Sequence, residues 1–326
     1  MKKTLFLFSS AFLCLIANAQ EETPKQKLQQ AIADKFPFAR VFDVKYTQYL
    51  PQDFDNKLLG SDFISGHINN RSKLNVAANI PIIMKSKWNL TASASYKYER
   101  AELERVKDFT GLPQSFYNTS HDFHYLSAAL SFTGYTSLFK KTLVYNASVI
   151  ADGTEKDAQR IKGFAGASIV LKANEKTKMT VGLIVVLDPA SPVPATPTFS
   201  LEHKFISGWI ADIIVPQRVF LKHDILSNGR LSLGTELVSD GFYLNTSAPG
   251  FAKVYDYRQI ELRSGATYEH WFTKGLIGTV KLGFANVFNA RITERGKSIN
   301  DYIFSSTQNG TGYFSLGFSY DPFTKK

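Results

Sequence analysis

Nine charged residues between positions 202 and 281 carry most of the chemistry that this sequence suggests. Each lies in a stretch where polar and apolar residues alternate, in the row that we expect to face the interior of a β structure. Charges of both signs on neighbouring strands can form cross-strand pairs. The set comprises Glu202, Lys204, Asp212, Arg218, Lys222, Glu236, Glu261, Arg263 and Lys281.

Two functions fit such a set. The first, which is the function we predict, is that the charges line an aqueous path, so that their cationic excess favours small polar or anionic solutes and the protein is a passive channel. Alternatively, the charges could pair with one another and close the interior, or lumen, of the β structure as a salt-bridge network, because an unpaired buried charge is costly. The second alternative describes a structural or surface-interaction protein. Four further inward residues that would take up space favour it: Phe164, Phe220, Tyr257 and Tyr313.

Signals for enzymatic chemistry are weak. A hydrolase needs a histidine within reach of a nucleophile, yet His203 and His223 lie in rows that we expect to face outward, with no serine beside them. The familiar phosphate loops, zinc spacings and calcium loops are absent from the sequence. We therefore expect no catalytic residue, metal or cofactor, and an outer-membrane hydrolase stays the most distant alternative.

The elements that must position these residues are strands. The stretch 197–238 contains four alternating runs separated by short turns, and a period of two indicates extended strands with one apolar and one polar face. Another strand follows the turn Lys85-Ser86, with an apolar row that begins at Trp88 and an entirely polar second row. Further strands are predicted at 41–50, 72–84, 121–133, 141–152, 159–172, 177–187, 255–269, 275–287 and 311–321.

The N-terminus predicts export. Lys2 and Lys3 precede the apolar run Leu5–Ile16, and Ala17-Asn18-Ala19 offers a cleavage site, which together are typical of a secretory signal peptide. We expect residues 1–19 to be that peptide, 20–38 a periplasmic N-terminal segment and 39–326 one β domain. The single cysteine, Cys14, lies inside the signal peptide, so the mature chain would have no disulfide.

Composition and pattern indicate a membrane protein that crosses with strands. The sequence after the signal peptide contains no run near the ~18 apolar residues of a transmembrane helix. Aromatic residues make up 13% of the chain, and the formal net charge is +10. Alternating segments of about ten residues with an aromatic excess are typical of a transmembrane β-barrel. We expect an antiparallel up-and-down barrel in a bacterial outer membrane.

The partners expected for such a barrel follow from its environment. The basic balance suits phosphate-bearing outer-membrane lipids and lipopolysaccharide rather than nucleic acid. The barrel-assembly machinery would insert the chain, and we expect a monomer.

The lengths of the connections predict the number of strands. Barrels of this kind alternate short periplasmic turns with longer extracellular loops. All the long connections (51–71, 100–120, 239–254 and 288–310) fall at one end only if Pro216-Gln217 separates two strands. This gives fourteen strands, with twelve as the alternative because the strands beside Pro216 are short.

The three tryptophans agree with that orientation. Trp88 and Trp209 each follow a predicted periplasmic turn, and Trp271 precedes another, although it is one residue out of phase with its outward row. Tryptophan favours the interface between membrane and water. We therefore predict a periplasmic aromatic girdle of these three residues.

Several segments of the chain resemble one known family. They are FDVKYTQYLPQDF near the start of the predicted barrel, TPTFSLEHKFISGW, IVPQRVFLK and NGRLSLGTEL in the centre, and YFSLGFSYDPF at the close. With the signal peptide, they are similar to the DUF6268 family of outer-membrane β-barrel proteins from Bacteroidota-type bacteria. The resemblance implies a barrel and an outer-membrane address. It implies no catalytic residue, because the family has no assigned function.

Overall fold

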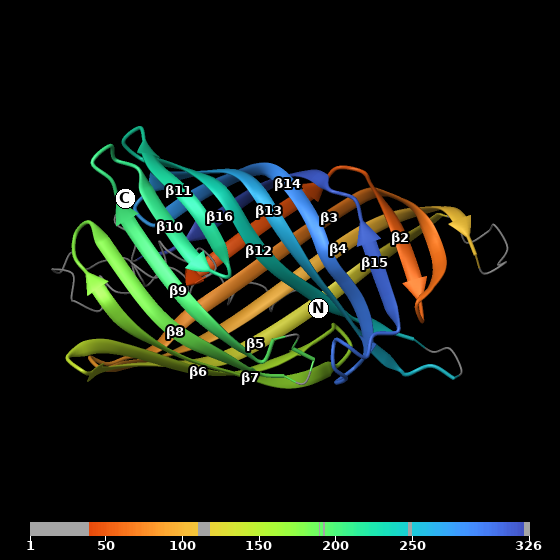
Figure 1. Ribbon diagram of the computed structural model, residues 1–326, viewed down its shortest axis with the longest axis horizontal. Helices are drawn as coiled ribbons and strands as arrows, with labels where there is room; N and C mark the ends of the chain where they lie inside the picture. Colours follow the sequence, from red (N-terminus) through yellow and green to blue (C-terminus); the bar gives the residue numbers. More distant parts are fainter. Residues whose placement is uncertain (1–38, 110–117, 189, 192, 247–249, 323–326) are drawn as a thin grey trace, which may run out of the picture.

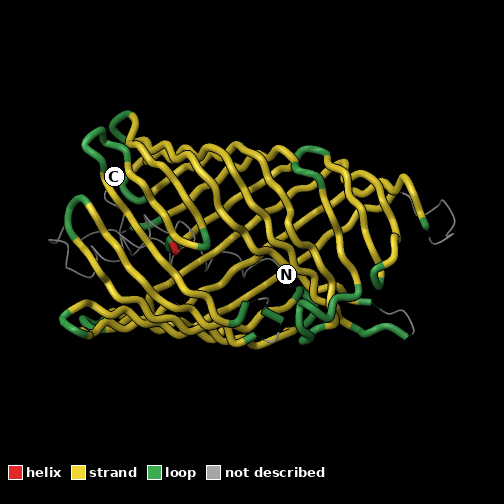
Figure 2. Tube along the Cα trace, viewed as in Figure 1, coloured by secondary structure: helices red, strands yellow, loops and turns green. Residues whose placement is uncertain are grey.

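The computed structural model describes residues 39–109, 118–188, 190–191, 193–246 and 250–322. The predicted signal peptide and the predicted N-terminal segment 20–38 lie outside these ranges. Within them, nearly all of the chain forms strands joined by turns and short loops (Figures 1 and 2). No helix of the described part is long and apolar enough to cross a membrane.

Sixteen strands make up the described chain, and all belong to one antiparallel sheet. They are β1 (Phe42–Tyr49), β2 (Gln52–Leu58), β3 (Ser61–Met84), β4 (Trp88–Asp108), β5 (Asn118–Leu138), β6 (Lys141–Gly153), β7 (Ala158–Ala173), β8 (Thr177–Leu187), β9 (Ala195–Lys204), β10 (Ile210–Val215), β11 (Arg218–Ile225), β12 (Gly229–Asn245), β13 (Val254–Thr273), β14 (Leu276–Glu294), β15 (Phe304–Gln308) and β16 (Thr311–Tyr320).

The sheet closes on itself as a barrel of fourteen strand positions. β1 and β2 follow one another along β3, while β15 and β16 follow one another along β14, so each pair occupies one position. The first strand, β1, pairs with the last, β16, and also with β3, which completes the circle. Pro216-Gln217 separates β10 from β11, which pair with each other. The prediction of fourteen strands is therefore confirmed.

The outward face of the barrel is apolar, as expected for strands in contact with lipid. Large apolar side chains that a soluble protein would bury stand exposed on it, among them Val149 at 62%, Leu282 at 58% and Phe284 at 59% exposure. The charged side chains described below lie on the opposite face. The fold is a transmembrane β-barrel.

The predicted long loops are wrong in extent, because strands occupy most of them. The predicted loop 51–71 contains β2 and residues 61–71 of β3, and the two strands form a hairpin at Leu59-Gly60. Both turn residues have positive φ, at 50° and 85°, as a two-residue turn between twisted strands requires. β4, β12 and β14 likewise extend into the predicted loops 100–120, 239–254 and 288–310. Polar residues on both faces hid these extensions from a search for alternation.

The wall of the barrel differs in height around its circumference. β3, β4, β5 and β13 have 20 to 24 residues, whereas β8 to β11 have only 6 to 11. The connections 85–87, 139–140, 174–176, 205–209, 226–228 and 274–275 define the short-turn end, on the left in Figure 1. The long strands project beyond the short ones at the other end, the long-loop end.

Two projecting edges meet above the low part of the wall. β5 has no partner on β6 before Leu126, and the ladder of β12 with β11 ends at Glu236. β5 and β12 occupy opposite positions in the strand order. Nevertheless, the rings of Phe123 and Phe242 stack with centroids 4.1 Å apart, and those of Tyr125 and Tyr243 lie 6.1 Å apart. The upper part of β12, together with β13, therefore bends across the interior.

Candidate functional site

The interior of the barrel contains a buried cluster of charges centred on Glu261 of β13, which is 0% exposed. Arg263 lies 2.6 Å from one carboxylate oxygen of Glu261, and Arg71 of β3 lies 3.4 Å from the other. The Tyr49 hydroxyl donates a hydrogen bond of 3.1 Å to the same carboxylate. Glu99 of β4 accepts a hydrogen bond from Arg71 at 2.8 Å. The alternating strands place all these side chains on the inner face, where only mutual pairing offsets their desolvation.

Ion pairs in this cluster join opposite walls of the barrel. Asp240 of β12 accepts hydrogen bonds from Lys73 of β3 at 2.8 Å and from Lys97 of β4 at 2.9 Å. Lys73 also lies 3.1 Å from Glu99. Because β12 and β4 are far apart in the strand order, these contacts span the lumen instead of following its wall.

A second cluster lies on the other face of the bent segment. Asp152 of β6 accepts hydrogen bonds from Tyr125 at 2.6 Å and from Tyr243 at 2.7 Å, and forms an ion pair with Lys162 of β7. Residues 238–245 of β12 and 254–261 of β13, here called the interior strap, thus have one face against β3 and β4 and the other against β6 and β7.

Ion pairs with Arg160 and Asp188 also hold the face of the interior strap that is turned toward β6 and β7. Asp256 lies 2.6 Å from Arg160 of β7, and Arg258 lies 3.4 Å from Asp188, which follows β8. Arg160 also lies 3.1 Å from Asp188. The strap therefore needs charged residues at both odd and even positions, because both of its faces are covered by charged walls.

A third cluster lies at the short-turn end. Arg40, which is 0% exposed, forms an ion pair with Glu269, and Arg230 lies 2.7 Å from the other oxygen of that carboxylate. The guanidinium of Arg230 lies 5.1 Å from the centre of the Trp271 ring. A cation above an aromatic face is a favourable arrangement.

The prediction that Trp271 belongs to a periplasmic aromatic girdle is wrong. Its side chain is 3% exposed and lies on the same inner face as Glu269, so it contacts Arg230 rather than lipid. The phase of the strand, which places residue 271 in the inward row, overrides the interfacial preference of tryptophan. Trp88 stacks on Phe132 and Trp209 stacks on His223, and both are partly exposed in outward rows. For these two, the girdle stays a prediction.

The predicted charge set falls into separate groups. Asp212 lies 2.8 Å from Arg218 and 2.6 Å from Lys222 on neighbouring strands. Glu236 pairs with Lys281 at 2.8 Å, and Glu261 pairs with Arg263 as described above.

Two members of the set lie apart from these buried groups. Glu202 pairs with Lys178, whose side chain is 56% exposed, and Lys204 is exposed. The prediction that all nine charges form one lumen network is therefore wrong for Glu202 and Lys204, because β9 ends at the rim of the short-turn end.

Sequence reasoning missed most of the residues that cross the lumen: Arg71, Lys73, Lys97, Glu99, Asp152, Arg160, Lys162, Asp188, Asp240, Asp256 and Arg258. Asp240 and Arg71 fell in predicted loops. Lys73 alternates with Leu74 in the same way as the residues that were chosen, so the alternation could have revealed it.

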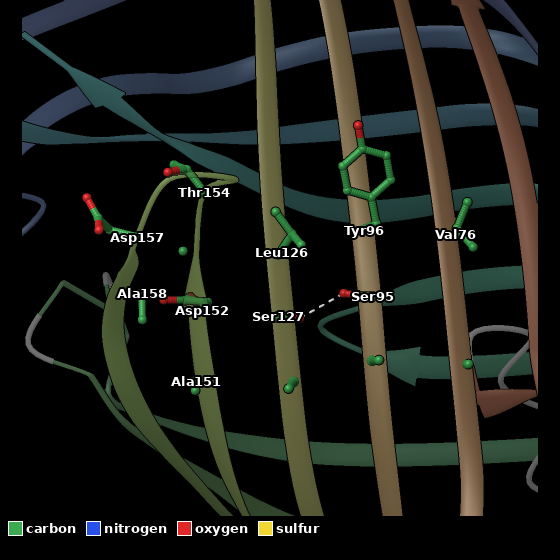
Figure 3. Close-up of a pocket in the computed structure, with 14 residues that line it drawn as sticks. Val76, Ser95, Tyr96, Leu126, Ser127, Ala151, Asp152, Thr154, Asp157 and Ala158 are labelled. Carbon is green, nitrogen blue, oxygen red and sulfur yellow. Dashed lines mark hydrogen bonds between the residues drawn. The ribbon is translucent and has the colours of Figure 1, made fainter. Parts of the chain in front are cut away.

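The outer face has a hollow of about 550 Å³ where the wall steps down beyond β5 (Figure 3). Four directly paired alanines on adjacent strands form its floor: Ala78, Ala94, Ala128 and Ala151. Tyr96 and Leu126 stand beside this row, and Asp157 lies in the turn at its edge. The small side chains account for the hollow, which opens on the outer face of the barrel beside the β6–β7 turn.

Among the residues that the structure describes, neither outward histidine contacts a serine or a carboxylate. His203 contacts the Thr177 hydroxyl at 2.8 Å and the ring of Phe205, and His223 stacks on Trp209. Among the described residues, no group of three or more His, Cys, Asp and Glu side chains could hold a metal ion.

No protein-family model matches the chain, and no curated protein matches it in sequence. The solved structures that resemble it include outer-membrane proteins. An outer membrane channel from Pseudomonas putida F1 is 11% identical with a TM-score of 0.38, covering 85% of this chain and 93% of its own.

Two further structures resemble the chain to a similar degree. A Pseudomonas aeruginosa FadL homologue is 8% identical with a TM-score of 0.39, covering 87% and 90% of the two chains. The P. putida toluene transporter TodX is 9% identical with a TM-score of 0.35, covering 91% and 93%. Likeness at this level carries no inference about function.

Proposed function

We propose that this chain is an outer-membrane barrel whose lumen is closed by an ion-pair network. With its lumen closed, the barrel would serve as a structural or surface-interaction protein. The contacts of the interior strap with both walls carry the proposal. Lys97 to Asp240 and Arg160 to Asp256 are short pairs between strands far apart in the barrel. A continuous water path would have to separate these charges, which is costly in a low-dielectric interior.

A passive channel for small polar or anionic solutes is the second candidate. The observation that favours it is a polar cavity below the interior strap, described in the next subsection, where Lys45, Lys97 and Arg263 outnumber Asp43 and Asp240. A channel of this kind would require the interior strap to leave its place. Catalysis is not part of either proposal.

Conductance in planar bilayers separates the two candidates. The purified wild-type barrel should give no stable conductance steps. The double variant Asp240→Asn with Asp256→Asn removes one charged anchor from each face of the interior strap, and it should conduct or flicker. The matched control, Asp55→Asn with Asp62→Asn at the exposed rim, should stay silent. Stable steps from the wild type would reject the closed barrel in favour of the channel.

The membrane address and partners form part of the same proposal. The apolar outward face supports residence in a bilayer, and the resemblance to the DUF6268 family supports the outer membrane of a Bacteroidota-type bacterium. Outer-membrane lipid, lipopolysaccharide and the barrel-assembly machinery are the partners that we infer, with a monomer as the state of the protein. Separation of inner and outer membranes on a density gradient tests the address. Recovery in the inner-membrane fraction would contradict it.

A further inference from the structure

A polar cavity of about 330 Å³ lies inside the barrel between the interior strap and the short-turn end. Asp240 and Arg263 border it on the side of the interior strap, and β1, β3, β4 and β5 supply the rest of its wall. Ser93, Ser95 and Ser127 leave the space open because their side chains are small. The cavity is therefore a consequence of small polar residues on the inner rows of adjacent strands.

Lys45 distinguishes this cavity from the paired clusters around it. In the described part of the chain, its ammonium group forms no ion pair and no hydrogen bond, whereas Arg263 is held by Glu261 and Lys281 by Glu236. Burial is the largest cost to the Lys45 charge, and repulsion from Lys281 and Arg263 adds to it. Asp43 and Glu236 offset part of this cost, but the Asp43 carboxylate already accepts a hydrogen bond from Ser319 at 2.6 Å, and Glu236 is paired with Lys281.

Asn75 adds neutral donors at the same place. It is the direct register partner of Lys45 on the neighbouring strand, and both residues line the cavity. Its side-chain amide likewise makes no hydrogen bond with the residues that the structure describes. The neighbouring polar groups are already engaged: Ser93 donates to Asn79 at 2.7 Å, and Ser95 and Ser127 share a hydrogen bond of 2.7 Å. An ammonium and a carboxamide side by side match the oxygens of a small anion.

We propose that this cavity is a binding site for a small carboxylate or phosphate anion, held by the Lys45 ammonium and the Asn75 amide. The ligand's negative charge compensates a partly buried cation that forms no ion pair in the described chain. Arg263 and Lys281 raise the positive potential of the site without losing their own carboxylates. The site lies on the short-turn side of the interior strap, so the proposal holds whether or not the lumen conducts.

Thermal unfolding of the purified full-length barrel in detergent tests this site. Inorganic phosphate and acetate serve as the two probes, each titrated against chloride at constant ionic strength, because a ligand that binds only the folded state raises Tm with its concentration. At least one probe should raise the Tm of the wild type. A response to phosphate alone identifies a phosphate site, and a response to acetate alone a carboxylate site.

Variants locate the effect. Lys45→Met should raise the Tm without ligand, because it removes a partly buried charge that has no ion-pair partner, and should weaken the ligand response at least tenfold. Lys57→Met, at the exposed rim, should respond as the wild type does. If Lys45→Met does not fold, Asn75→Val serves in its place and should also weaken the response. An unresponsive wild type, or a response that survives in Lys45→Met and Asn75→Val, would overturn the proposal.

Discussion

At the scale of single residues, Glu261 is the carboxylate on which the central cluster depends most. It is fully buried and contacts two guanidinium groups and the Tyr49 hydroxyl. Removal of one partner from a buried charge pair leaves the others uncompensated, which costs far more than the pair itself contributes. The residue is therefore a better test of the cluster than any of the cations that share it.

Glu261→Gln should lower the free energy of unfolding by about 3–5 kcal/mol, because Arg71 and Arg263 lose their common counter-charge while their side chains stay buried. Urea titration of the barrel in lipid vesicles measures the change. Glu102→Gln is the matched control, since Glu102 pairs with Arg100 at 3.2 Å but is 40% exposed. An exposed pair contributes ~0–1 kcal/mol. Equal effects of the two substitutions would mean that the central cluster is wet.

Leu282 tests the opposite face of the wall. It is 58% exposed on β14 and its neighbour Lys281 points inward, so it should contact lipid. Leu282→Arg should destabilise the barrel by about 2–4 kcal/mol if it lies near the bilayer midplane. Leu59→Arg, in the exposed β2–β3 turn, should have little effect in the same vesicle assay. Tolerance of arginine at 282 would show that this face does not contact hydrocarbon.

At the scale of elements, the interior strap explains why some strands look irregular in sequence. A strand with one face on lipid and one on a polar interior alternates cleanly, as residues 88–97 of β4 do. The upper parts of β12 and β13 are covered on both faces by charged walls, so polar residues occupy both of their rows. Their irregular pattern reflects their position between β3–β4 and β6–β7, not a lack of strand structure.

The orientation of the hairpins can be tested with two matched lysines. Lys156 lies in the β6–β7 turn and Lys176 in the β7–β8 turn, at the opposite end of the barrel. Both side chains are exposed. The predicted mature chain has no cysteine, so Lys156→Cys and Lys176→Cys each supply a unique thiol. On intact cells an impermeant thiol reagent should label the first and not the second. The reverse result would place the long-loop end in the periplasm.

At the scale of the whole molecule, closure depends on contact between the two ends of the barrel domain. β1 pairs with β16 along its full length, and Thr47 donates a hydrogen bond to Ser315 at 3.0 Å across this seam. A barrel without this pairing would expose two edges to lipid, where unpaired backbone groups are costly. The seam is therefore the contact that makes the sheet a barrel.

The double variant Thr47→Cys with Ser315→Cys should form a disulfide on oxidation, because the two residues are direct register partners on the inner face. Peptide mass mapping of the folded, oxidised barrel detects the cross-link. Thr47→Cys with Ser319→Cys is the control, and it should not cross-link because residue 319 lies four positions further along β16. Cross-linking of the control pair instead would mean that the register between β1 and β16 is shifted.

Features that depend on near neighbours along the chain could be predicted from the sequence. The two-residue period assigns one row of each strand to lipid and the other to the interior, which correctly separates Leu282 from Lys281 and Leu262 from Arg263. Proline at 216 and the lengths of the connections were enough to predict fourteen strands. The inward position of Trp271 was also visible in the sequence, because this residue is out of phase with the outward row of its strand.

The contacts of the interior charges, in contrast, arise from the folded barrel and could not be predicted from the sequence. The partners of Asp240 and Asp256 lie on strands far apart in the sequence and in the barrel, and they meet because β5 and β12 project above the low wall of β6 to β11. That difference in height arises from all the strand lengths and registers together, so no local pattern encodes it. For the same reason the sequence left the channel and the closed lumen as open alternatives, whereas the bent strap favours closure.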